Sequence, residues 1–280
     1  MKKFVSLALA LALGLSLTAC GGGNNAVEDD QDPVATQEQA APETADSDMA
    51  YVQDKGTLVV GITDFAPMDY KDDAGEWIGF DADMAKAFAE SLGVEVQFIE
   101  INWDNKAMEL DTKGIDAVWN GMTITQEVTA LMGVSEAYCN NGQVVVVPAD
   151  KAADYQDVDS LSSLNFAAEN GSAGAEQLDE LGISYTAVDT QAKALMEVAA
   201  GTSDAAVIDL LMAGAMIGEG TSYPDLTYTV QLNDEEYGVG FRKGSDLVDA
   251  FNDFWKEAYA DGTVLEVAEV YGVQESVIAK

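Results

Sequence analysis

Short apolar runs alternate with amphipathic stretches over most of this chain, and the alternation restricts the folds that it can adopt. Runs such as Leu58–Ile62 suit strands of a sheet that is covered on both faces. Amphipathic helices between such strands are typical of α/β proteins. We expect strands at 58–62, 94–101, 115–119, 143–147, 165–168, 184–188, 205–208 and 237–242, and helices at 82–92, 105–113, 174–180, 190–200, from 209 onward, at 246–260 and at 264–271.

The N-terminus has the pattern of a secretory signal peptide. Lys2 and Lys3 precede an apolar run without charge, which ends at Leu17-Thr18-Ala19-Cys20. This ending resembles a bacterial lipobox, which implies cleavage before Cys20 and a diacylglycerol thioether on its sulfur. Acyl chains would then hold the protein at the membrane, on its extracytoplasmic face. An uncleaved anchor and an ordinary cleaved signal are the alternatives.

Residues 21–49 form an acidic segment that contains no basic residue. Such a composition buries too little apolar surface to fold and favours a disordered, self-repelling tether. The folded part is expected to run from about residue 50 to Lys280, a length that suits one large or two modest domains.

Composition excludes several kinds of function. The chain has 50 acidic residues against 13 Lys and Arg, so nucleic-acid binding, which needs a basic surface, is excluded. The acidity favours solubility or the capture of cations, or reflects a salty habitat. The sequence has no His, which rules out a Ser-His-Asp triad and a His metal site. Cys139 has only Cys20 as a possible partner, so we expect a buried thiol rather than a disulfide or a reactive cysteine.

Residues 56–84, GTLVVGITDFAPMDYKDDAGEWIGFDADM, combine a buried strand, a turn with an aromatic residue, a hairpin around Gly75 and the start of a helix. This passage resembles the extracytoplasmic solute-binding proteins of ABC importers for polar amino acids (family 3), and the resemblance covers nearly all of the remaining chain. It implies a two-lobed, periplasmic-binding-protein-like α/β fold of type II, in which 51–142 and 238–280 form the first lobe and 143–237 the second. Two hinge crossings, near Gln143 and Tyr237, would join the lobes, and ligand would lie in the cleft between them.

Two aromatic residues match positions that face the ligand in this family. Phe65 ends the first strand, where ligands of open α/β sheets bind, and matches the aromatic that stacks on the ligand. Trp103 matches a second aromatic that faces the cleft. The alternatives are a hydrophobic plug under the loop for Phe65 and a lid over the core for Trp103.

Residues 115–128 match the strand and loop that hold the backbone groups of an amino acid in this family. The resemblance places Asn120, Gly121 and Thr123 at the ligand, where a hydroxyl and backbone amides would meet a carboxylate. Where the family typically has Arg, this chain has Val128. Arg is the side chain best shaped to bind a carboxylate, and the only Arg here, Arg242, matches a surface turn.

The second lobe supplies a Gly/Ser turn and an acid. Glu169, Gly171, Ser172 and Ala173 surround a turn that precedes a helix and could present N–H groups to an anion, although such a loop is also a common plain turn. Asp209 matches the family's acid that receives the ligand's α-ammonium group. Its position between a strand and a helix also suits a helix N-cap.

These patterns predict a lipid-anchored binding protein, without catalytic activity, cofactor or metal, that delivers an amino acid to a membrane permease. Because Val128 replaces Arg, three possibilities stay open: a carboxylate held by Thr123 and turn amides, a cationic amine that lacks an α-carboxylate, or a cationic ligand drawn to Asp209 and Glu169. Two alternatives belong to other functional classes. One is a dehydratase-like enzyme on the same fold, whose anionic substrates would require basic residues in the cleft. The other is a sensory module, for which we would expect a transmembrane helix or a signalling domain after Lys280.

Overall fold

The computed structural model describes residues 47–280, so the predicted signal peptide, Cys20 and most of the predicted tether lie outside the described residues. The first element is helix α1 (Asp48–Lys55), which Ser47 caps by accepting a hydrogen bond from the Ala50 N–H. Asp48 and Met49, which the sequence places at the end of the tether, therefore belong to a helix. Within residues 47–280, no helix is both long enough and apolar enough to cross a membrane.

The first sheet is mixed and has the strand order β4-β1-β5-β13-β6, with β7 paired to β13. Strand β1 runs parallel to β4 and β5, whereas β13 runs antiparallel to β5, β6 and β7. The C-terminal part of the chain thus returns to the sheet that the N-terminal part begins. The strands are β1 (Thr57–Ile62), β4 (Glu95–Glu100), β5 (Ala117–Thr123), β6 (Gly133–Val134), β7 (Cys139–Asn141) and β13 (Glu235–Phe241).

The second sheet is also mixed, with the order β10-β9-β11-β8-β12. Strand β9 runs parallel to β10 and β11, and β8 runs antiparallel to β11 and β12. The strands are β8 (Gln143–Pro148), β9 (Phe166–Glu169), β10 (Tyr185–Val188), β11 (Ala205–Asp209) and β12 (Leu226–Gln231). The predicted α/β class is confirmed, with two sheets built from different parts of the chain.

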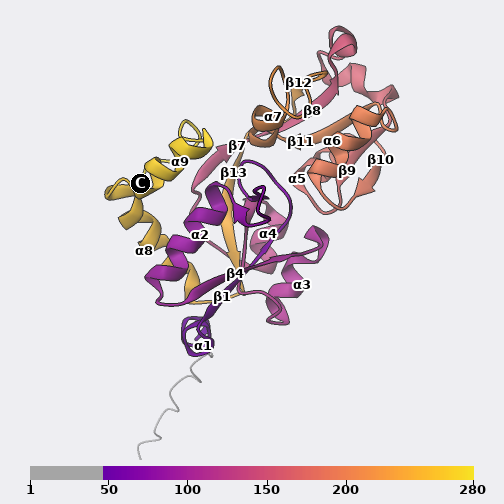
Figure 1. Cartoon of the computed structure of the whole chain (residues 1–280). Helices are drawn as coiled ribbons and strands as arrows, with labels where there is room; N and C mark the ends of the chain where they lie inside the picture. The colour runs from indigo at the N-terminus through magenta and orange to yellow at the C-terminus, as the bar shows by residue number, and fades with distance from the viewer. Residues whose placement is uncertain (1–46) are drawn as a thin grey trace, which may run out of the picture. The chain divides into compact units, whose positions relative to one another are not determined.

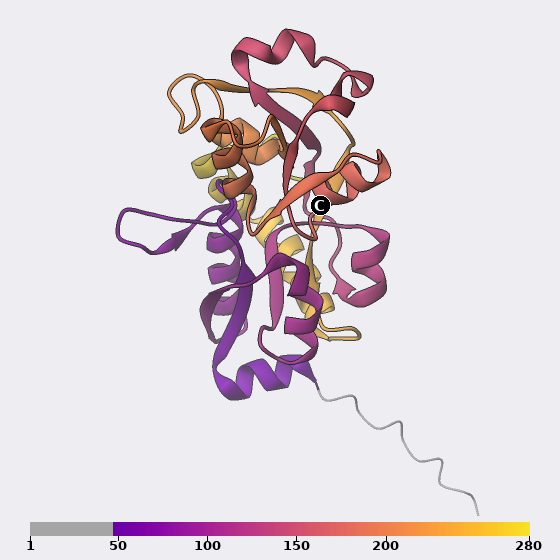
Figure 2. The same cartoon turned by 90° about the vertical axis from the view of Figure 1, so that its right-hand side faces the viewer.

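Helices cover both sheets (Figure 1). Helices α2 (Phe80–Ser91) and α8 (Leu247–Ala260) pack against the first sheet, and α9 (Thr263–Tyr271) packs against α2 and α8. Helices α5 (Ala173–Glu180), α6 (Gln191–Ala200) and α7 (Leu210–Met216) pack against the second sheet. The short helices α3 (Lys106–Asp111) and α4 (Gln126–Leu131) flank β5, and short 3₁₀ helices occupy 103–105, 149–154 and 158–163. In Figure 2, α1 lies beside the first sheet, at the end that faces away from the second sheet.

The core beneath α2 and α8 is rich in aromatic residues. The Trp119 ring of β5 packs against Phe251 with centroids 4.9 Å apart, and Trp255 lies 5.0 Å from Tyr138. Such ring pairs are worth roughly 0.5–1.5 kcal/mol beyond the area that they bury. Cys139 is fully buried beside them, as predicted, and burial raises the pKa of its thiol.

Two predictions of local structure require correction. The predicted hairpin around Gly75 is present as β2 (Tyr70–Lys71) and β3 (Trp77–Ile78). The structure also contains α1, α4 and β12, which the sequence patterns do not predict. Strand β5 is longer than its apolar core because it continues to Thr123, through residues that the sequence places in a loop.

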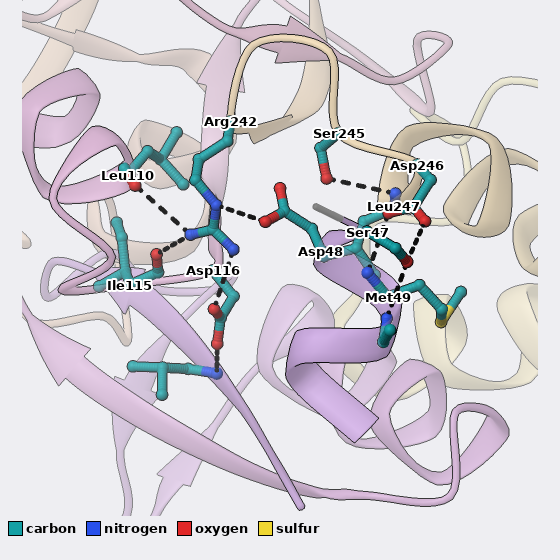
Figure 3. Close-up of polar contacts among 12 residues, drawn as sticks. Ser47, Asp48, Met49, Leu110, Ile115, Asp116, Arg242, Ser245, Asp246 and Leu247 are labelled. Carbon is teal, nitrogen blue, oxygen red and sulfur yellow. Dashed lines mark hydrogen bonds and ion pairs between the residues drawn. The ribbon is translucent and has the colours of Figure 1, made fainter. Parts of the chain in front are cut away.

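The sequence suggested that Arg242 lies on a surface turn, but this prediction is wrong. It directly follows β13 and is 8% exposed. Its guanidinium donates to the Asp48 carboxylate at 2.8 Å and to the Asp116 carboxylate at 3.2 Å, and to the carbonyls of Leu110 and Ile115 (Figure 3). The only Arg of the chain is therefore used to fix α1 against the first sheet.

Candidate ligand-binding cavity

Loops and strand ends from both sheets line a cavity with about 420 Å³ of space that no protein atom fills. This volume includes space that is open to solvent. All ten residues that the sequence assigned to the ligand site line this cavity, namely Phe65, Trp103, Asn120, Gly121, Thr123, Glu169, Gly171, Ser172, Ala173 and Asp209. The structure thus brings them together, and their contact with a solute stays a prediction.

Phe65 and Trp103 form the aromatic walls of the cavity. Phe65 packs edge-on against Tyr237, with ring centroids 6.4 Å apart. Gly121 makes room for the Phe65 ring: it has φ +56°, and a Cβ there would lie 2.5 Å from the Phe65 Cε1. Gly121 therefore fixes the backbone conformation and the ring position together.

Asn120 lines the cavity, but its amide is bonded within the protein. Its oxygen accepts from the Thr63 N–H at 2.9 Å and the Thr63 hydroxyl at 2.8 Å, and its nitrogen donates to the Asp69 carboxylate at 2.7 Å. The Gly121 N–H likewise donates to the Asp81 carboxylate at 2.7 Å. These two residues shape the wall rather than offer free polar groups.

Asp209 ends β11 and precedes α7 in the N-cap position, but its carboxylate makes no capping hydrogen bond. One oxygen accepts from Asn141 Nδ2 at 2.5 Å and from Gln143 Nε2 at 2.6 Å, and the other accepts from Gln191 Nε2. Three side-chain amides therefore hold this 3% exposed carboxylate in place. Helix capping does not explain its side chain.

A second carboxylate, Glu235, lies behind Asp209 and shares its amides. Its Oε1 accepts from Asn141 Nδ2 at 2.6 Å, from Gln143 Nε2 at 2.8 Å and from the Thr123 hydroxyl at 3.0 Å. Burial raises the pKa of Asp209 well above its usual range, and the neighbouring Glu235 raises it further. The Thr123 hydroxyl proton is thus directed at Glu235 in this structure.

Glu169 ends β9 and is 3% exposed. Among residues 47–280, its Oε1 has no hydrogen-bond partner. Burial, followed by repulsion from Asp209, raises the pKa of Glu169 to about 8, and attraction to Lys106 opposes the shift. This carboxylate is buried but only weakly compensated.

Lys106 is the only cationic side chain among the described residues that line the cavity. Its Nζ lies 5.0 Å from the centroid of the Trp103 ring and donates to the carbonyl oxygens of Trp103 and Gly171, at 3.3 and 3.0 Å. Burial lowers its pKa, while Glu169 raises it in part. The bond to Gly171 joins the α3 region to the turn before α5.

Val128 and the turn before α5 complete the wall. Val128, in the position that the family resemblance assigns to Arg, is 6% exposed and lines the cavity. Ser172 is the N-cap of α5, and its hydroxyl oxygen accepts from the Ala175 N–H at 3.1 Å. Gly171 has φ +71°, and a Cβ there would lie 2.9 Å from Asp104, so the chain needs glycine at this close approach.

The sequence prediction missed several residues of the wall. Gln191, at the start of α6, could not be found because nothing local in the sequence links it to Asp209. Lys106 could have been found, because it follows Trp103 by three residues at the start of a helix, a spacing that places the two side chains on one face. The additional lining residues are Lys106, Met122, Thr125, Val128, Glu176 and Gln191.

Comparison with known proteins gives a consistent result. Residues 58–274 match the family described as bacterial extracellular solute-binding proteins, family 3. The chain is similar to the L-cystine-binding protein TcyJ of Escherichia coli (28% identity over 222 residues, 78% of this chain and 83% of the relative). It is also similar to the ABC transporter glutamine-binding protein GlnH of Bacillus subtilis (30% identity, 95% of this chain and 96% of the relative).

Among solved structures, a mutant of ArgBP from T. maritima superposes with a TM-score of 0.75 at 31% identity, covering 80% of this chain and 99% of that one. The two-sheet architecture is therefore that of a periplasmic binding protein. All three relatives are described as binding proteins, and this chain is a binding protein rather than an enzyme.

Proposed function

This chain belongs to the bacterial extracellular solute-binding proteins, family 3, and we propose that it captures an amino acid and delivers it to the permease of an ABC uptake transporter. The observation that supports this most directly is the cavity, in which residues from both sheets place buried carboxylates beside two aromatic rings. Such a site suits a small solute that carries an ammonium group. The names of the relatives, which include glutamine-binding and cystine-binding proteins, support the amino-acid class.

Asp209 is the proposed receptor of the ammonium group. Its carboxylate lies in the cavity wall and is fixed by the amides of Gln143, Gln191 and Asn141, so it is positioned before the ligand arrives. A carboxylate on the solute would meet Lys106 and the turn at Ser172 instead of an Arg, because Val128 occupies that position. The other predicted residues line the cavity and would contact the solute as parts of its wall.

We further propose that 51–142 with 238–280 and 143–237 are two lobes that close on the solute. The chain passes between the sheets twice, after β7 and before β13, and the two crossings touch: the Gln143 N–H donates to Asn233 Oδ1 at 2.7 Å. A Cβ on Gly142 would lie 2.6 Å from the Asn233 carbonyl oxygen. Crossings packed so closely would bend as one hinge. Small-angle scattering with saturating solute should give a more compact particle, and an unchanged radius would argue against closure.

The membrane attachment is proposed from the sequence alone. Cys20 would carry the lipid, and residues 21–49 would connect it to the extracytoplasmic binding domain. Metabolic labelling with a fatty acid should mark the parent protein. Equal labelling of Cys20→Ala would refute lipidation at this cysteine.

A calorimetric titration with a panel of amino acids and amines tests the binding function. Asp209→Asn should weaken binding of the identified solute about tenfold or more, because a charge-assisted hydrogen bond is worth roughly 1.5–3 kcal/mol. The unfolding of both proteins in urea should be measured in parallel, since the substitution would place a fourth amide group among three amide donors. If a folded Asp209→Asn protein binds as tightly as the parent, the proposed site is wrong.

A further inference from the structure

Glu169 is the carboxylate of the cavity whose hydrogen bonding is incomplete. It is 3% exposed, it lines the cavity, and no atom of the described residues bonds its Oε1. Asp209, by contrast, accepts hydrogen bonds on both of its oxygens. Buried polar atoms are almost always paired, so an unpaired one that faces a cavity indicates a missing partner.

The nearby cation does not supply this partner. Lys106 lies close enough to influence Glu169 electrostatically, but its Nζ is directed at the carbonyl oxygens of Gly171 and Trp103. Glu169 takes part in none of the ion pairs formed within residues 47–280. The partner must therefore come from outside the protein, either as solvent or as part of the solute.

The charges of the cavity indicate what the partner carries. Three acids, Glu169, Glu176 and Asp209, line it against the single cation Lys106 among the described residues. One donor of the wall that could favour an anion is committed elsewhere, because the Thr123 hydroxyl donates to Glu235. An electrostatic environment of this sign attracts a positive group to Glu169.

We propose that the solute carries two cationic nitrogen groups and that Glu169 receives the second of them. The inference rests on the proposed function, in which Asp209 receives the first. The faces of Trp103 and Phe65 would cover the apolar chain between the two cations and add cation–π attraction. The class includes diamino acids and guanidino amino acids, and also diamines and guanidino amines without a carboxylate.

The test compares ligands that differ by one charge and little else. Calorimetry on the full-length protein should use arginine against citrulline, and lysine against norleucine, with cadaverine and agmatine as the forms without a carboxylate. The parent protein should prefer the dicationic member of each pair by about tenfold to a hundredfold, the range of one charge-assisted hydrogen bond. Tighter binding of cadaverine than of lysine would assign the solute to the amines, and the reverse would assign it to the amino acids.

Variants separate the role of Glu169 from the general charge of the site. Glu169→Gln should reduce the preference for the dicationic member to a few-fold, and Glu169→Asp should retain part of this preference. Glu176→Gln removes the same charge from a more exposed position in the same wall and should change the preference by less than about threefold. Thermal unfolding verifies that each variant is folded.

The outcomes of this test are distinct. A parent protein that binds neutral amino acids as well as dicationic ones, or a Glu169→Gln protein that keeps the full preference, would overturn the inference while leaving amino-acid binding intact. In that case Glu169 is a buried acid that water satisfies. A parent protein that binds no amino acid and no amine would overturn the proposed function and this inference together.

Discussion

The buried charges around Arg242 and those around the cavity differ in how completely they are paired. Arg242 faces Asp48 and Asp116 (Figure 3). Asp116 also accepts from Lys55 and from the Val59 N–H. In the cavity, by contrast, carboxylates meet amides and one another. The complete cluster, formed by Arg242, Asp48, Asp116 and Lys55, is paired within the protein. The incomplete cluster, formed by Asp209, Glu235 and Glu169, leaves Glu169 Oε1 without a partner among residues 47–280. We therefore expect the complete cluster to stabilise the fold and the incomplete cluster to receive the solute.

The largest expected effect comes from breaking the complete cluster. Arg242→Met should lower the free energy of unfolding by about 3–5 kcal/mol, because Asp48 would stay buried without a compensating charge and Asp116 would keep only Lys55. Urea unfolding of the ligand-free protein measures this change. Lys193→Met, which breaks an exposed ion pair with Asp189, is the control and should leave the free energy nearly unchanged. Equal effects of the two substitutions would contradict the distinction.

The incomplete cluster should respond to pH in the opposite sense to an ordinary ion pair. The pKa of Glu169 is raised from 4.5 to about 8, so the folded state holds a proton that the unfolded state loses between these values. Stability of the ligand-free protein should therefore fall as pH rises through this range. Burial is the main cause of the raised pKa of Glu169. Asp209 raises this pKa further, and Lys106 together with the Gln191 and Thr63 side chains lowers it.

Glu169→Gln should remove part of this pH dependence. Between pH 5 and pH 8, the free energy of unfolding of the variant should fall less than that of the parent, by about a few kcal/mol. For the parent protein, affinity for a cationic solute should rise from pH 6 to pH 8, because binding requires the ionised carboxylate. Urea unfolding and calorimetry at several pH values measure both. Asp69 and Asp81, whose pKa values burial also raises, contribute to the parent and to the variant alike. Identical pH profiles for both proteins would show that Glu169 does not titrate in this range.

Much of the fold and the site could be predicted because they depend on local patterns. Phe65 follows the first apolar strand, at the edge where ligands of open α/β sheets bind, and the family resemblance assigned Glu169 and Asp209 to the same site. The partners of Arg242 could not, because Asp48 and Asp116 are 194 and 126 residues away in the sequence. Its local context, a Phe-Arg-Lys-Gly segment, has the composition of a turn. What decides its burial is a long-range ion pair that no local pattern contains.

Adding a cation to the cavity wall tests whether the negative charge of the incomplete cluster selects the solute. Val128→Arg places a guanidinium in the wall beside acids that lack one. If the solute has an α-carboxylate, the new Arg should strengthen its binding by up to about tenfold. If it is a carboxylate-free cation, binding should weaken by at least as much, because Arg would pair with the acids and repel it. Val128→Leu controls for size, and an equal effect of both substitutions would show that the charge of this wall is not what selects the solute.

The smallest expected effect concerns the contact between the turn before α5 and the α3 region. Gly171→Ala would place a Cβ 2.9 Å from Asp104, and the Lys106 bond to the Gly171 carbonyl would be displaced. Affinity should fall a few-fold if closure needs this approach. Gly182→Ala is the matched control, because Gly182 has a similar φ of +69° but nothing within 4 Å of an added Cβ. Both variants should lose about 1 kcal/mol of stability from the left-handed backbone, so only the difference in affinity reports on closure. If the two variants bind equally well, the Gly171 contact is incidental and the incomplete cluster selects its solute without help from this part of the wall.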